Sequence, residues 1–188
     1  MSEKDNIELQ KQIKRFLDVL KRNKQEHLSP VQSGNIDSRA LFNLCFDHYE
    51  SNLPLHASWL LEKYLKAERL QLQLLHSDII SRLNEVRIEG SQRIFGNIII
   101  CILDKRSNIR LNSHQEEMII ETIFNWMITP DKAVAVVANC FEILYYLSNK
   151  HSWVKEELVA QIEYFLKDGP PSIQSRGRKI LSRIRKNI

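Results

Sequence analysis

Small residues recur within the hydrophobic stretches of this chain at a nearly constant interval. The positions that form this first column are Ala57, Gly96, Ala138 and Gly177. Their separations are 39, 42 and 39 residues, and a second column of apolar residues keeps almost the same period. The second column consists of Leu83, Ile123 and Ile162. Two columns with one period indicate stacked helix pairs, in which small side chains let neighbouring helices approach closely.

Between these columns, apolar residues fall three and four positions apart, which is the spacing of one buried helix face. The pattern predicts an all-α fold of about eight or nine helices, arranged as an α-α superhelix. We expect a single helical-repeat domain over residues 1–188, with an N-terminal helix at 1–24, a linker at 25–36 and stacked helix pairs at 37–187. The helices expected within the array begin near Ala40 and continue at 55–67, 72–86, 90–102, 113–127, 133–147, 152–166 and 172–186.

Two of these helices contain many β-branched residues and depend on further signals. The valines of residues 133–147 favour a strand, but the apolar positions there also mark one helical face, and the repeat favours the helix. Ser113 and Glu116 are three residues apart and match a capping box, which predicts that residues 113–127 are helical despite their isoleucines.

The two columns resemble the HEAT and armadillo-like α-α superhelix class, and the similarity covers residues 37–187. More narrowly, the chain is similar to a group of small uncharacterised bacterial helical-repeat proteins, some of which are catalogued as adenylosuccinate lyase-like. The segments that carry this similarity are SRALFNLCF, HASWLLEK, FEILYYLSNK and SRGRKIL. The resemblance implies a fold and no activity.

The chain departs from the patterns of both groups of proteins. It lacks the regular Asp and Arg ladder between the helices of HEAT repeats. It also lacks the Gly-Ser-Ser, Met-Pro, Lys and Asn signature loop of the superfamily that contains adenylosuccinate lyase. A lyase activity is therefore not predicted.

The cysteines and the apolar runs bear on location. Cys45, Cys101 and Cys140 lie in apolar stretches without a CxxC pair, which is typical of small buried hydrophobic residues. We therefore expect a reducing, cytoplasmic compartment. The N-terminal segment is polar and acidic, and the longest apolar run, residues 98–103, is too short to cross a bilayer, so no membrane partner is predicted.

The sequence predicts no catalytic residue, no metal ligand and no cofactor. The six histidines are dispersed singly without HExxH spacing, and the cysteines lack the electropositive setting that a nucleophile needs. No phosphate-binding glycine loop or GxSxG motif occurs. The tryptophans fall in or beside apolar helical stripes, which favours packing in the core or between repeats over stacking on a partner. They are Trp59, Trp126 and Trp153.

Carboxylates gather on the second helices of two consecutive pairs, where we expect most of them to face outward. They are Glu116, Glu117, Glu121, Glu156, Glu157 and Glu163. In related superhelices the second helices line the concave side, so these residues predict an acidic groove for a basic peptide or protein segment. The alternative interpretation is an ordinary solvated helix surface.

The basic residues of the chain concentrate at its C-terminal end. The formal net charge is +4, but residues 170–188 carry six cations and no acid, so residues 1–169 have a net charge of −2. The cations are Arg176, Arg178, Lys179, Arg183, Arg185 and Lys186. They predict either an end cap, favoured by the helix dipole, or a phosphate-binding patch.

These observations favour a noncatalytic helical-repeat scaffold that binds another protein or a peptide. The alternative is a HEAT-like protein that binds nucleic acid through its basic C-terminal end. An enzyme ranks third because no convergent acid, base or nucleophile can be named. The sequence predicts no particular oligomeric state.

Overall fold

A computed structural model of the protein describes residues 7–8, 11, 37–46 and 52–186. Ile7, Glu8 and Lys11 are helical, and the rest of the helix expected at 1–24 and the linker expected at 25–36 lie outside the described residues. None of the described residues belongs to a β-strand. The all-α prediction is therefore confirmed.

The described helices alternate with short connections. The α-helices are α3 (Ser38–Leu44), α4 (Leu53–Ala67), α5 (Arg69–Ser81), α6 (Glu89–Leu103), α7 (Ser113–Ile128), α8 (Val134–Ser148), α9 (Ser152–Asp168) and α10 (Pro171–Lys186). Two short 3-10 helices, η1 (Leu83–Glu85) and η2 (Lys105–Ser107), follow α5 and α6. None of the described helices has the length and hydrophobicity that crossing a bilayer requires.

The chain divides into two compact units, Met1–Leu75 and His76–Ile188. In the first unit α3 packs against α4, and the hydroxyl of Ser38 donates a hydrogen bond of 2.9 Å to the side chain of Gln71 in α5. Pro54 lies in the first turn of α4, where its missing N–H removes no helical hydrogen bond. Ala57 of the small-residue column is completely buried in this unit.

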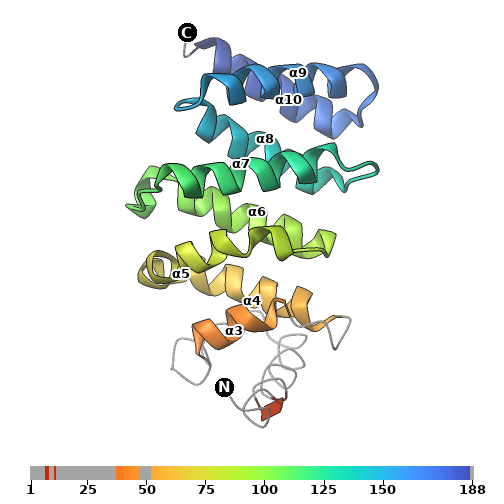
Figure 1. Ribbon diagram of the computed structural model, residues 1–188. Helices are drawn as coiled ribbons and strands as arrows, with labels where there is room; N and C mark the ends of the chain where they lie inside the picture. The colour runs from red at the N-terminus through yellow and green to blue at the C-terminus, as the bar shows by residue number, and fades with distance from the viewer. Residues whose placement is uncertain (1–6, 9–10, 12–36, 47–51, 187–188) are drawn as a thin grey trace. The chain divides into compact units, whose positions relative to one another are not determined.

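In the second unit, α8 is the central helix and contacts α6, α7, α9 and α10 (Figure 1). Its apolar positions cover more than one side, because it needs a separate contact surface for each of these neighbours. The second-column positions Leu83, Ile123 and Ile162 are fully buried. In the first column Ala57, Gly96 and Gly177 are buried, whereas Ala138 is half-buried.

The two glycines of the first column lie at close approaches between helices of the second unit. A methyl group added to Gly96 in α6 would lie 3.0 Å from Cβ of Asn139 in α8. A methyl group added to Gly177 in α10 would lie 2.8 Å from Cγ2 of Ile162 in α9. Helices this close leave no room for a larger side chain, which explains why glycine occupies both positions.

Two local predictions are corrected by the structure. The capping box of α7 uses Asn112 and Gln115 instead of Ser113 and Glu116, because the helix begins at Ser113 and its cap is the preceding residue. The helix expected at 72–86 starts earlier and ends at Ser81, so that Leu83 is buried in η1 instead.

The three tryptophans differ in their exposure. Trp126 is buried as predicted and Trp59 is half-buried, but Trp153 is 54% exposed although we expected it to face inward. Its position in the first turn of α9 places it beside α7 instead of under α9, where its ring stacks on Phe124.

We predict that Gly96→Ala destabilises the protein. Overpacking against Asn139 costs about 1–3 kcal/mol, which exceeds the gain of up to about 1 kcal/mol in helix propensity. The variant should therefore show a lower midpoint in urea unfolding monitored by circular dichroism. Ser175→Ala, at an exposed position of α10, should change the midpoint little, and an equal shift in both variants would contradict the close approach.

Candidate functional site

The six predicted carboxylates do not form one surface. Glu116 is buried, whereas the other five are exposed. Glu117 and Glu121 lie on α7, which contains no lysine or arginine, and Glu157 lies on the edge of α9 that faces α7. Glu156 and Glu163 lie on a different side of α9, where they help to line a pocket against α10. The six carboxylates therefore lie in three different settings.

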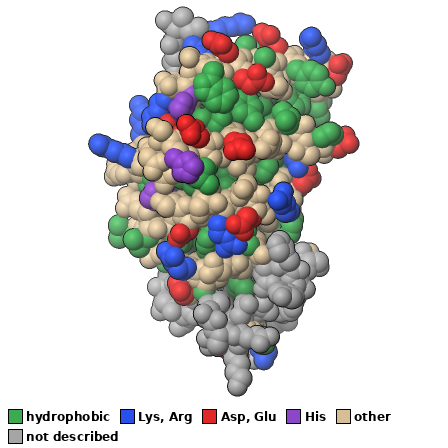
Figure 2. All heavy atoms as spheres, in the orientation of Figure 1, with side chains coloured by type: hydrophobic (Ala, Val, Ile, Leu, Met, Phe, Trp, Pro, Cys, Tyr) green, Lys and Arg blue, Asp and Glu red, His purple; other side chains and the backbone are tan. Residues whose placement is uncertain are grey.

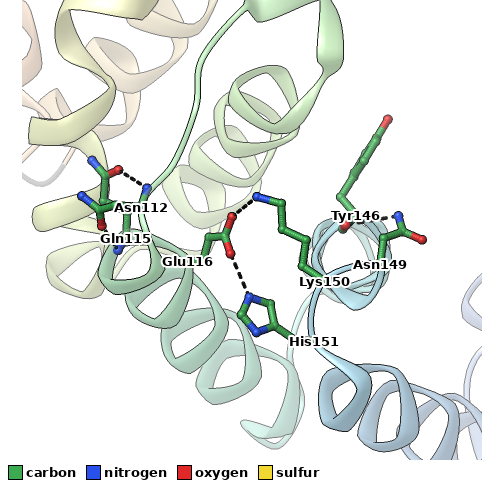
Figure 3. A network of polar contacts seen from close by, with 7 residues as sticks. All are labelled: Asn112, Gln115, Glu116, Tyr146, Asn149, Lys150 and His151. Carbon is green, nitrogen blue, oxygen red and sulfur yellow. Dashed lines mark hydrogen bonds and ion pairs between the residues drawn. The ribbon is translucent and has the colours of Figure 1, made fainter.

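Glu116 joins two consecutive helix pairs. Figure 3 shows its carboxylate between the side chains of Lys150 and His151, which stand at the connection from α8 to α9. Nε2 of His151 lies 2.8 Å from one carboxylate oxygen, and Lys150 pairs with the other. The expectation that Glu116 faces outward with the other carboxylates was wrong, because position 116 lies on the inner side of α7 with Ile119 and Ile123.

The electrostatics of Glu116 follow from this setting. Burial by itself raises the pKa of the carboxyl, but hydrogen bonds from Lys150 and His151 and their positive charges outweigh it, so the net pKa lies below its ordinary value. The carboxylate stays charged at neutral pH and ties the α8–α9 connection to α7. This contact is structural, and it removes Glu116 from any binding surface.

Three of the exposed carboxylates lie beside two aromatic rings on α7 and α9. We call this surface the α7–α9 face and define it by Glu117, Glu121, Phe124, Trp153 and Glu157. The rings of Phe124 and Trp153 stack with centroids 6.0 Å apart and planes inclined by 25°. Glu121 lies three residues before Phe124, and Glu157 lies four residues after Trp153, so each carboxylate shares a helix side with a ring. Figure 2 shows hydrophobic and acidic side chains interspersed over α7 and α9.

Sequence analysis missed the aromatic part of this face. Trp153 is 54% exposed; Tyr164, also on α9 but outside this face, is 69% exposed. The signal that could have found Trp153 is its four-residue distance from Glu157, which places it on a polar side of α9. The sequence predicts that this tryptophan packs in the core or between repeats, because large aromatic rings are usually buried. Its stack on Phe124 does join consecutive pairs, but more than half of the residue stays exposed.

Two pockets flank this region within the second unit. The first has a volume of about 500 Å³, and its lining includes Met118, Glu121 and Trp126 of α7. Lys132 also lines it, and its Nζ lies 3.2 Å from Oε1 of Gln92 and 3.5 Å from Oε1 of Glu89. The second, about 610 Å³, lies between α9 and α10. Its lining is Ser152, Lys155, Glu156, Val159, Glu163, Leu181, Ile184 and Arg185. Because acidic and basic groups alternate there, this second pocket is not an acidic groove.

One residue of the predicted basic patch, Arg183, is engaged in contacts within the protein. Arg183 donates hydrogen bonds of 2.7 and 2.8 Å to the two carboxylate oxygens of Glu142, and its guanidinium carbon lies 3.9 Å from the ring centroid of Tyr145. Burial lowers the pKa of Arg183, but the hydrogen bond and charge of Glu142 outweigh it and raise the net value. Arg183 therefore fixes α10 to α8. The exposed cations of α10 are Arg176, Arg178, Lys179, Arg185 and Lys186.

The described His, Cys, Asp and Glu side chains bear on metal binding and on thiol chemistry. No group of three or more His, Cys, Asp or Glu side chains in this part of the chain could hold a metal ion. The cysteines are free thiols, with Cys45 and Cys140 buried and Cys101 partly buried. Burial raises the pKa of Cys140 to about 12, so its reactive thiolate form is suppressed.

Comparison with known proteins gives the family. A family model described as a HEAT repeat domain matches residues 9–184. This protein belongs to the HEAT repeat family. HEAT repeats form helical scaffolds that commonly mediate protein interactions, and the family is typically noncatalytic. Neither a curated protein nor a solved structure matched the chain. The HEAT match confirms the predicted family and its all-α repeat fold.

We predict that Glu116→Gln destabilises this HEAT repeat protein at neutral pH by about 1–3 kcal/mol, because Lys150 and His151 lose a buried charged acceptor. The folded pKa of Glu116 is depressed, so its contribution is present above the ordinary carboxyl pKa and is lost as the pH falls through the folded value. The difference between wild type and variant should accordingly narrow in acid.

Urea unfolding at neutral and acidic pH measures this difference. Glu117→Gln is the matched control, since it changes the adjacent but exposed carboxylate and should have little effect. A Glu116→Gln variant as stable as Glu117→Gln at neutral pH would show that the buried network contributes nothing.

Proposed function

We propose that this protein is a noncatalytic, cytoplasmic scaffold whose α7–α9 face binds a basic segment of another protein or a basic peptide. The observation that carries the proposal is the set of exposed carboxylates on two consecutive second helices, Glu117, Glu121 and Glu157, beside the exposed ring of Trp153, which stacks on the half-buried Phe124. Membership of a family whose repeats commonly mediate protein interactions supports it. The free, mostly buried cysteines are consistent with a reducing compartment.

The charges of the face favour a cationic partner. The α7 helix carries three carboxylates and no cation, and the ion pairs found among the described residues use neither Glu117 nor Glu121. Glu157 accepts a hydrogen bond of 2.8 Å from the neutral side chain of Gln161. Their negative charges are thus available to a ligand, and a basic segment would be attracted by all three.

Aromatic rings give the face an apolar component that an ordinary solvated helix surface does not need. Trp153 exposes more than half of its area, although aromatic side chains stabilise a protein most when they are buried. Rings exposed among carboxylates suit recognition of long basic side chains, which have apolar stems and charged ends.

We predict that the combined substitutions Glu117→Lys, Glu121→Lys and Glu157→Lys weaken binding of a fluorescein-labelled peptide of alternating lysine, arginine and glycine by about tenfold or more at low salt, because attraction becomes repulsion. Fluorescence anisotropy measures the affinity. Binding of the wild type should also weaken as salt is added.

The matched control changes two carboxylates of α9 that lie outside the face, through Glu156→Lys and Glu163→Lys. This variant should lose much less affinity than the triple variant. Equal losses would show that the peptide responds to net charge alone, and unchanged binding by the triple variant would refute the α7–α9 face as the binding surface.

A second candidate function is nucleic-acid binding by α10. The specific observation in its favour is that α10 exposes Arg176, Arg178, Lys179, Arg185 and Lys186 and contains no acid. Such a helix can contact phosphates through charge alone. Gel shifts with a mixed-sequence DNA test this candidate, and the absence of any shift at low salt would remove it.

A further inference from the structure

We infer that Trp153, stacked on Phe124 and flanked by Glu121 and Glu157, forms a subsite for an arginine side chain of the bound segment. This inference rests on the proposed function and deepens it, because it names the residue type that the α7–α9 face recognises. It assigns to Trp153 a role in specificity that the carboxylates cannot provide.

The protein already contains one arginine site built in the same way. Arg183 of α10 lies with its guanidinium carbon 3.9 Å from the centroid of the Tyr145 ring. Its Nη1 donates at once to both oxygens of Glu142, at 2.7 and 2.8 Å. Here a carboxylate and an aromatic ring three residues apart on one helix hold a guanidinium by charge, hydrogen bonds and contact with the ring face.

The α7–α9 face repeats this arrangement at an exposed place. Glu121 and Phe124 have the same three-residue spacing on α7 that Glu142 and Tyr145 have on α8. Trp153 extends the aromatic surface from Phe124 onto α9, and Glu157 supplies a second carboxylate one helical turn further along. The chain occupies its own site with Arg183, whereas no cation among the described residues is paired with Glu121 or Glu157.

Trp153 is suitable for stacking because only part of its ring is covered. Phe124 lies against the indole at a shallow angle of 25°, yet 54% of the residue remains exposed. A planar guanidinium can lie on the uncovered part of the indole while its edge N–H groups donate to a neighbouring carboxylate. The ammonium of lysine has no plane to stack on the indole, and its three N–H groups do not form the planar fork of a guanidinium. The subsite should therefore prefer arginine over lysine.

The test compares two labelled peptides of equal length and charge, one with arginine and glycine and one with lysine and glycine. Wild-type protein should bind the arginine peptide about two- to fivefold more tightly, as one exposed cation–π contact provides. Trp153→Leu should bring the two affinities close to equality while leaving binding of the lysine peptide nearly unchanged. Trp153→Phe, which keeps a ring, should retain part of the preference.

Tyr164→Leu is the matched control, because it removes an exposed ring of α9 that lies outside the Phe124 stack. It should keep the preference for arginine. Circular dichroism of each variant checks the fold, and the exposure of both rings makes a folded variant the expected outcome. The shift of the Trp153 indole N–H in NMR spectra on adding the arginine peptide, against a constant signal from buried Trp126, provides a second measurement.

The outcomes separate this inference from the proposed function. If both peptides bind through the carboxylates but Trp153→Leu keeps the arginine preference, or Tyr164→Leu abolishes it, the subsite is wrong and the basic-segment proposal stands. If neither peptide binds the wild type at low salt, both are overturned. Loss of the preference in Trp153→Leu alone supports the subsite.

Discussion

The second unit of this protein depends on burial of α8 by four neighbouring helices. The α6, α7, α9 and α10 helices all contact it, and its core side chains, among them Phe141 and Leu144, are fully buried. A helix that is apolar on several sides cannot remain in water, so its neighbours must stay in place for the unit to be stable. Close approach at Gly96 and Gly177 is what allows the helices to meet without gaps.

Polar contacts then fix the neighbouring pairs to one another. Glu116 binds the α8–α9 connection, and Arg183 binds α10 to α8 through Glu142 and Tyr145. Both contacts use charged groups that the sequence alone would assign to the surface. Glu116 is buried, and a buried charge is costly unless it is paired, so Lys150 and His151 stabilise it; Arg183 is half-buried and is held by Glu142 and the Tyr145 ring.

The α7–α9 face results from this division of roles. The inner sides of α7 and α9 are committed to the core through Ile123 and Ile162, which leaves the outer sides of both helices with their carboxylates and rings. Stacking of Trp153 on Phe124 connects the two outer sides. The repeat architecture thus positions the outer sides of α7 and α9 next to each other, while the chemistry of that surface resides in residues that the core does not need.

The sequence by itself determined the repeat, the helical content and the core columns, because apolar side chains must recur at the spacing of a helix whenever pairs of helices share one core. It also identified the exposed carboxylates Glu117, Glu121 and Glu157. Only the tertiary structure decided that Glu116 is buried and paired, that half-buried Arg183 is paired with Glu142, and that Trp153 is exposed beside Phe124. Helical periodicity says which side of a helix a residue occupies, but the neighbour it meets across the repeat depends on packing between segments 34 to 41 residues apart, and no local pattern records it.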